Sequence, residues 1–269
     1  MLLKILSVSS TKKEISMILR VLGSSGAEFP GYNQPAFLID GKILLDGGTI
    51  GSCLSESEQW AIKNILITHS HLDHIKAIPF LADNIIVKHK KHSITLYGIK
   101  QTLSALRKHL LNDKIWPDFT KISSSIEPVI KLKNITTGNT FDVDGYAVSA
   151  YGVNHTVPAV GYIITDKAGR SLLYTGDTGP TEKIWNTPHK VHTVIVEVSF
   201  PNSMQTLAKK TGHLTANLLV RELDKIKHPP EKILITHPKP QYLEQIKKEL
   251  KNIRNRKIEL LRDGKVYEI

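Results

Sequence analysis

The sequence predicts an α/β protein with αββα architecture, in which two mixed sheets are flanked by helices. Two observations support this fold class. Short apolar strands come first and then alternate with amphipathic helical segments along the 269 residues. Several of the strands are continuous apolar runs, which suit strands buried on both faces. Two sheets packed together, with helices outside, would bury such strands in this way.

The first half of the chain is expected to contain five strands and one long helix. Gly23 and Gly26 follow the first apolar run and are expected to permit a sharp turn. Gly41-Lys42 separates the second run from the third, which is typical of a β-hairpin. The strands are expected at residues 17–22, 36–40, 43–46, 65–68 and 85–88. The helix is expected at about 94–111, where Leu96, Ile99, Leu103, Leu106 and Leu110 recur at helical spacing.

The second half of the chain is expected to contain further strands, with two amphipathic helices late in the sequence. Strands are expected at residues 141–151, 161–165, 171–174, 191–198 and 233–236, and helices at 214–226 and 242–250. No internal repeat, low-complexity tract or Pro/Gly-rich linker divides this stretch. Residues 17–269 are therefore expected to form one domain.

Residues 1–16 precede the first predicted strand and are expected to be an N-terminal extension. Their apolar residues are too few and too interrupted for a secretory signal, so a cytoplasmic location is expected. No run of about 18 apolar residues is present, so no membrane association is expected. A single cysteine excludes a disulfide framework within the chain and Cys-rich zinc or iron–sulfur sites.

The charge of the chain is strongly positive. Lys and Arg number 36 against 25 Asp and Glu, which gives a net charge of +11 with histidine neutral. A positive field attracts anions, so phosphorylated substrates or nucleic acid become candidate ligands. A Lys-rich surface without a specific partner is the alternative. The chain also contains 12 histidines, which raises the question of a metal site.

The segment His69-Ser70-His71-Leu72-Asp73-His74 carries the clearest functional signal. Three imidazoles and one carboxylate occupy six consecutive positions directly after a buried strand. Imidazole and carboxylate are ligands of zinc, iron and manganese. On a tight turn, His69 and His71 can point to one side and Asp73 and His74 to another, so one loop could serve two adjacent metal positions.

Three other apolar strands also end in a polar side chain of ligand type. They are followed by His155, Asp177 and His237 respectively. Strand ends at one edge of a sheet converge in space, so residues distant in sequence can complete one site. Each of these residues has an ordinary structural explanation taken singly, as a core histidine, a turn former or a helix-entry residue. Their joint occurrence favours a shared site.

With these three residues, the His69–His74 segment resembles the metallo-β-lactamase superfamily, whose members are αββα sandwiches with a dinuclear metal centre. The resemblance implies two divalent metal ions, with Zn²⁺ the default and Fe or Mn accepting the same ligands. His69, His71 and His155 would bind the first ion, and Asp73, His74 and His237 the second. Asp177 would bridge the two ions. Asp46, in Leu44-Leu45-Asp46-Gly47-Gly48, would orient ligand imidazoles from behind.

Further segments resemble one branch, the class II 3′,5′-cyclic-nucleotide phosphodiesterases. They lie at residues 110–118, 197–202, 212–215 and 236–240. This resemblance implies hydrolysis of cAMP or cGMP to the 5′-monophosphate by attack of a metal-bound hydroxide. Asp73 would orient the nucleophile, and His213 would protonate the leaving oxygen. His213, Ser199 and Asn202 would contact the substrate.

Two other functions remain open at this point. A tRNA 3′-processing endonuclease of the same superfamily would suit the high net charge and would make nucleic acid the partner. A non-catalytic nucleotide or nucleic-acid binder is the second alternative, although the complete ligand set favours an enzyme. Phosphodiesterases of this kind often form dimers, so a homodimer is also expected.

Overall fold

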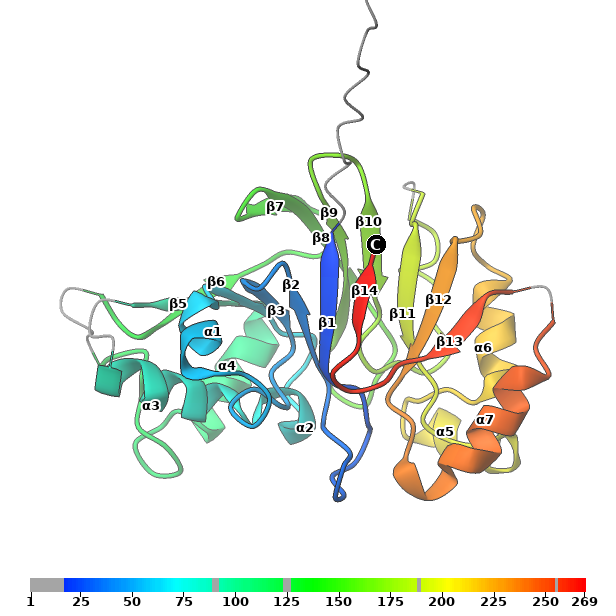
Figure 1. Ribbon diagram of the computed structural model, residues 1–269, viewed down its shortest axis with the longest axis horizontal. Coiled ribbons are helices and arrows are strands. Elements are labelled where there is room, and N and C mark those ends of the chain that lie inside the picture. The colour runs from blue at the N-terminus through cyan, green and yellow to red at the C-terminus, as the bar shows by residue number, and fades with distance from the viewer. Residues whose placement is uncertain (1–16, 89–91, 123–126, 188–189, 255) are drawn as a thin grey trace, which may run out of the picture.

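Two seven-stranded mixed sheets pack face to face, and helices cover the outer face of each (Figure 1). The computed structural model describes residues 17–88, 92–122, 127–187, 190–254 and 256–269. The predicted αββα class is confirmed. The expected extension at residues 1–16 lies outside the described residues.

The first sheet is built from the N-terminal half of the chain together with the last strand. In spatial order its strands are β14 (Val266–Glu268), β1 (Ile18–Gly23), β2 (Ala36–Ile39), β3 (Ile43–Leu45), β4 (Asn64–Leu66), β5 (Ile94–Gly98) and β6 (Ile130–Asn134). The pairs β3–β4, β4–β5 and β5–β6 are parallel. The pairs β14–β1, β1–β2 and β2–β3 are antiparallel. The β2–β3 hairpin is as predicted, with Asp40 and Gly41 both at positive φ.

The second sheet is built from the C-terminal half. Its order is β13 (Ile258–Leu260), β12 (Lys232–Thr236), β11 (Thr193–Glu197), β10 (Ser171–Tyr174), β9 (Val160–Thr165), β8 (Tyr146–Gly152) and β7 (Thr140–Val143). Strands β10 to β13 are parallel. The antiparallel pairs β8–β9 and β9–β10 give β8 the same direction as β10. The C-terminal ends of β8, β10, β11 and β12 therefore share one edge.

Helices shield the outer faces of both sheets. The longer helices α3 and α4 lie on the first sheet's side of the molecule, and α6 and α7 lie on the second sheet's side (Figure 1). The helices are α1 (Glu56–Ala61), α2 (Leu72–Ile75), α3 (Ile78–Lys88), α4 (Lys100–His109), α5 (Gln205–Lys210), α6 (Ala216–Leu223) and α7 (Leu243–Lys251), with short 3₁₀ turns at Asn202–Met204 and Pro240–Tyr242. None of the helices in the described ranges is long and apolar enough to cross a bilayer.

Three apolar layers hold these elements together. The layer between the sheets contains fully buried aromatic side chains, among them Phe37 and Tyr174, whose rings meet edge-on at 5.1 Å. The other two layers lie between each sheet and its helices. Tyr162, from the second sheet, donates its hydroxyl to the Ile67 carbonyl at 2.8 Å. This bond fixes the segment that leads into His69 against the opposite sheet.

Three element predictions are corrected by the structure. Residues 141–151 were expected as one strand but form the hairpin of β7 and β8, because Asp144 and Gly145 both take positive φ and turn the chain. Residues 85–88 were expected as a strand but end helix α3, because Ile85 continues a buried stripe with Ile78, Leu81 and Ala82 at helical spacing. A short β-branched run cannot be told from a helix end by composition alone. Residues 94–98 were expected to be helical but form β5, and the helix begins only at Lys100. Leu96 matches the helical stripe in spacing but is buried within the sheet.

Candidate metal centre

The loop after β4 brings four ligand-type side chains to one edge of the sandwich. It crosses His69 and Ser70 and enters helix α2, which has His71 at its N-cap and contains Asp73 and His74. His69 and His74 are fully buried, with 0% of each residue exposed. His74 donates its backbone N–H to the His71 carbonyl at 3.0 Å. This tight turn separates the four side chains into two sets, as the sequence predicted.

His69 and His71 form the first set together with His155, which follows strand β8. His155 Nε2 lies 3.0 Å from His71 Nδ1, and the His69 ring centroid is 4.7 Å from those of both neighbours. One ligand atom from each of the three lies within 4.8 Å of the others. The three imidazoles can therefore address a single ion.

Asp73 and His74 form the second set together with Asp177 and His237, which follow strands β10 and β12. His237 Nε2 lies 3.3 Å from Asp73 Oδ2 and 3.2 Å from Asp177 Oδ2. His74 Nε2 lies 3.3 Å from the same Asp177 oxygen. Ligand atoms about 2.1 Å from a tetrahedral ion stand about 3.4 Å apart, which agrees with these separations.

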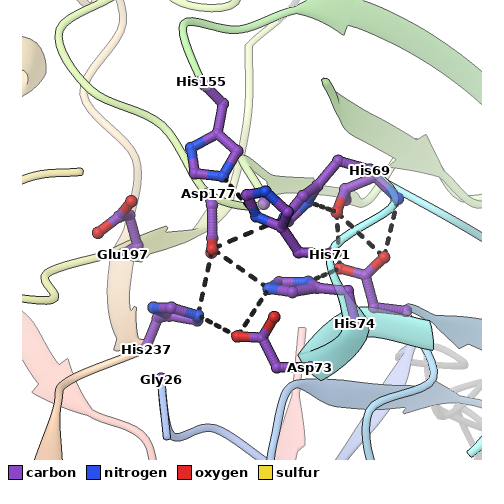
Figure 2. A network of polar contacts seen from close by, with 12 residues as sticks. Gly26, His69, His71, Asp73, His74, His155, Asp177, Glu197 and His237 are labelled. Atoms are coloured by element: carbon purple, nitrogen blue, oxygen red, sulfur yellow. Dashed lines mark hydrogen bonds and ion pairs between the residues drawn. The ribbon is translucent and has the colours of Figure 1, made fainter. Parts of the chain in front are cut away.

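Asp177 lies between the two sets (Figure 2). Its Oδ2 is 3.8 Å from His69 Nε2 of the first set, in addition to its short approaches to the second. A single carboxylate can thus reach both positions. The structure brings together all seven residues that the sequence singled out as ligands.

Asp46 lies behind the centre, as the family resemblance implied, and its carboxylate contacts Thr68 and His74 of the ligand loop. Its Oδ2 is 2.7 Å from His74 Nδ1 and accepts the Tyr174 hydroxyl at 2.8 Å. Its Oδ1 accepts the Thr68 backbone N–H at 2.8 Å. With Nδ1–H donated to a carboxylate, His74 presents the Nε2 lone pair to the interior.

Three other imidazoles are oriented in a similar way. His155 Nδ1 lies 2.9 Å from the Gly212 carbonyl oxygen, which can only accept a hydrogen bond. His69 Nδ1 lies 3.0 Å from Thr68 Oγ1, and His237 Nδ1 lies 2.8 Å from Ser199 Oγ. These contacts occupy Nδ1 and leave Nε2 of each ring facing its set.

The buried Nε2 atoms of His69 and His74 make no hydrogen bond within the described part of the chain. A buried polar nitrogen without a partner is costly and calls for an explanation. Coordination of a divalent ion would satisfy both atoms. The donor set of five imidazoles and two carboxylates also suits zinc, iron or manganese. The residues present therefore fit the metal centre that the sequence implies.

The pKa directions agree with this arrangement. Burial, aided by neighbouring imidazoles, lowers the pKa of His69, His71 and His155, so these rings are neutral and can donate lone pairs. Burial also lowers the pKa of His74, but the carboxylates of Asp177 and Asp46 raise that pKa by more than burial lowers it, so the net direction is upward. The negative potential that favours a proton on His74 would equally favour a cation.

A second network lies beside His237 and contains His213, the expected proton donor. His213 Nδ1 is 2.7 Å from Glu197 Oε1, and its ring stacks on that of His237 with centroids 5.4 Å apart. Burial lowers the pKa of His213, but the Glu197 carboxylate raises it more, and the net direction is upward. Glu197 begins the segment 197–202 that resembles the phosphodiesterase branch, but the sequence analysis assigned it no role.

Ser199 and Asn202, both expected to contact substrate, make hydrogen bonds within the protein. Ser199 is fully buried, and its hydroxyl donates to Glu197 Oε2 at 2.7 Å while facing His237 Nδ1. Ser199 therefore positions two histidines from behind. Asn202 Oδ1 accepts the Asn217 N–H at 2.8 Å, so its side chain is engaged at the start of helix α6.

Gly26 packs against His237 (Figure 2). A Cβ atom at position 26 would lie 2.5 Å from His237 Nδ1 and 2.6 Å from its carbonyl oxygen. Gly26 lies in a bend of the chain, as expected, and the close approach leaves no room for a side chain there. His237 itself has φ +64°, and its N–H donates to the Ser24 carbonyl at 2.6 Å.

Comparisons with known proteins agree with this geometry. A family model described as the β-lactamase superfamily domain matches residues 54–237. A Yersinia pestis protein named "Probable 3′,5′-cyclic-nucleotide phosphodiesterase" is 25% identical over 211 residues, which are 68% of this chain and 58% of that protein. The chain thus spans little more than half of that relative's length. A ribonuclease Z of Methanococcus maripaludis is 24% identical over 232 residues, covering 67% of this chain and 72% of that protein.

Among solved structures, unliganded yeast PDE1 superposes with a TM-score of 0.81 at 20% sequence identity, covering 95% of this chain and all of the other. This likeness shows the shared fold. The matched region of the family model contains every residue of the two ligand sets, from His69 to His237. The chain therefore belongs to the metallo-β-lactamase superfamily.

Proposed function

We propose that this protein is a dinuclear metal-dependent phosphodiesterase that hydrolyses 3′,5′-cyclic nucleotides to 5′-monophosphates. The observation that carries the proposal is the pair of ligand sets joined at Asp177, with the protonatable His213 beside them. A relative named for the same activity supports the choice of substrate class.

The proposed ligand roles follow the geometry. His69, His71 and His155 would hold one divalent ion, and His74, His237 and Asp73 would hold the other. Asp177 would serve both. Two ions at such a centre can acidify water and neutralise the charge that develops on a phosphoryl group.

The remaining chemistry belongs to the side chains. Asp73 is partly exposed. Burial raises the pKa of its carboxyl, but the neighbouring imidazoles of His237 and His74 lower that pKa by more, so the net direction is downward. Its carboxylate is thus ionised and can accept a hydrogen bond from the attacking water. His213 carries a proton whose loss is opposed by Glu197, and it can pass that proton to the departing 3′ oxygen. Glu197 also holds the His213 ring in place through Nδ1.

The proposal is tested by loading the protein with Zn²⁺, Mn²⁺ or Fe²⁺, measuring bound metal, and assaying cAMP, cGMP and a precursor tRNA side by side. Release of a 5′-monophosphate from a cyclic nucleotide is the expected result. A fully metal-loaded protein that leaves both cyclic nucleotides intact would contradict it. Bis(p-nitrophenyl) phosphate, included in the same series, separates a catalyst from a binder.

A tRNA 3′-processing endonuclease is the second candidate, favoured by the ribonuclease Z relative and by the net charge of +11. A nuclease that contacts many phosphates loses affinity steeply as salt rises, because each contact releases counterions. A cyclic nucleotide carries one phosphate and makes few such contacts. The salt dependence of KM for the best substrate therefore distinguishes the two candidates.

A further inference from the structure

Lys239 lies beside the metal centre and has no place in the ligand scheme. It follows His237 by two residues, and its backbone is fixed at both ends. Its N–H donates to the Ser199 carbonyl at 3.2 Å, and its own carbonyl accepts the Tyr242 N–H at 2.9 Å. Its Nζ donates to the Gly26 carbonyl at 2.5 Å. Because Gly26 packs on the His237 ring, this contact places the ammonium group at the edge of the second ligand set.

The ammonium of Lys239 is held by a neutral acceptor rather than by an acid. Among the described residues, no ion pair joins Lys239 to a carboxylate. Lys76, at the end of helix α2, differs in this respect. Its Nζ is 2.6 Å from Oε2 of Glu28, two residues after Gly26, so its charge is balanced. The positive charge of Lys239 is therefore available to an incoming anion.

The charge balance of the site indicates which anion that would be. Asp46, Asp73, Asp177 and Glu197 lie in or behind the centre, and their negative charges would be matched by two divalent ions. A phosphodiester brings one further negative charge, which protonated His213 and Lys239 would both face. The backbone N–H of Lys239 donates to the carbonyl of Ser199, whose hydroxyl lies 3.2 Å from Nδ1 of His213, the expected proton donor. Lys239 is therefore on the side of the centre where the leaving oxygen would be.

We infer that Lys239 binds a non-bridging phosphate oxygen of the substrate, exchanging the Gly26 carbonyl for it, and so acts as a substrate-binding residue of this centre. The inference rests on the proposed function in that the substrate is a phosphodiester. It requires no movement of the Lys239 backbone, since a lysine side chain can redirect its donors by rotation alone.

The test compares Lys239→Gln with the matched variant Lys76→Gln, which removes a lysine charge that Glu28 already balances. We expect Lys239→Gln to raise KM for cAMP about tenfold or more, as does loss of one hydrogen bond to a charged group, with bound metal unchanged and kcat changed less than about threefold. The inhibition constant for inorganic phosphate should rise in parallel. Lys76→Gln should move both values less than about twofold, and Lys239→Arg should restore most of the affinity.

A merely structural role for Lys239 gives a different pattern. In that case Lys239→Gln would lower the melting temperature or the metal content while KM and phosphate inhibition stayed the same, and the inference would be overturned. Lys239→Met keeps the aliphatic chain and must show the same rise in KM as Lys239→Gln. If the wild-type protein hydrolyses no cyclic nucleotide, the proposed function fails. Calorimetric titration of inorganic phosphate into the metal-loaded proteins then still decides the role of Lys239.

Discussion

Glu197 Oε1 lies 2.7 Å from His213 Nδ1, and this contact couples the end of strand β11 to the expected proton donor. The carboxylate also accepts the Ser199 hydroxyl, which in turn faces His237 Nδ1. One buried acid therefore orients both the proton donor and a residue of the second ligand set.

Replacing Glu197 with Gln should change the pH profile of kcat. His213 donates its proton only while protonated, so activity falls as pH rises through its pKa, which Glu197 holds above its ordinary value. Without the carboxylate charge that pKa drops, and the alkaline limb should move to lower pH. Stopped assays across pH 5–10 with constant metal loading measure this shift. An unmoved alkaline limb would assign the limb to another group.

His213→Ala should separate catalysis from metal binding. We expect kcat to fall by about 10²-fold or more, as is usual for loss of a general acid, while both ions stay bound. Elemental analysis of the dialysed variant and its steady-state rate give the two readouts. His69→Ala is the matched comparison and should lose metal and turnover together. Activity in a metal-free His69→Ala protein would refute the ligand scheme.

Asp46→Asn should weaken metal binding although Asp46 is not a proposed ligand. Its carboxylate fixes His74 and accepts from Thr68 and Tyr174, and loss of such a supporting partner typically lowers metal affinity by about 10–100-fold. Competition with a chromogenic chelator measures the affinity. Tyr174→Phe removes one hydroxyl from the same carboxylate and should cost only about 1 kcal/mol of stability, with metal affinity nearly intact.

Gly26→Ala should damage the second metal position selectively. The added Cβ would overlap both the imidazole and the carbonyl of His237, and neither atom belongs to a freely moving chain end. Bound metal should fall from about two ions per chain to about one, because the three histidines of the first set are untouched. Gly152→Ala is the control, since a Cβ there meets no atom within 4 Å. If Gly26→Ala still binds about two ions per chain, the backbone around residue 26 can shift to make room for the added Cβ, and the prediction is wrong.

Removing the metal should lower the melting temperature. The proposed ligands come from both sheets, so each ion would join segments that are otherwise held only by packing. An ion at 100 times its dissociation constant adds about 2.7 kcal/mol to folding stability. Thermal unfolding with EDTA, and again after adding back Zn²⁺, tests this. An apo protein that melts at the holo temperature would contradict a folded-state metal site.

The ligand cluster could be predicted from sequence because its chemistry is concentrated. Four ligand-type residues fall within His69–His74, and His155, Asp177 and His237 each follow an apolar strand. Parallel strands then bring these ends to one edge without further information. The role of Glu197 could not be found in this way, although it lies in the resembling segment 197–202. A glutamate that ends a strand is common, and its partner His213 reaches it only through the fold.

The wrong predictions at residues 85–88 and 94–98 have similarly local causes. Ile85 and Leu96 sit in apolar runs that fit a helix or a strand equally well, and tertiary packing decided each case against the expectation. Ser199 and Asn202 were placed at the substrate by resemblance alone. Whether such side chains face the site or the interior depends on hydrogen bonds that no linear pattern records.

The return of the chain from β13 to β14 has a consequence for how the molecule is made. Strand β1 finds its outer partner in β14, where Ile18 is opposite Glu268. During synthesis, the edge of β1 that β14 covers therefore stays exposed until the second sheet has been translated. The first sheet is complete only when β14 has been made. Chaperones that shield strand edges would therefore have their longest opportunity to act at β1.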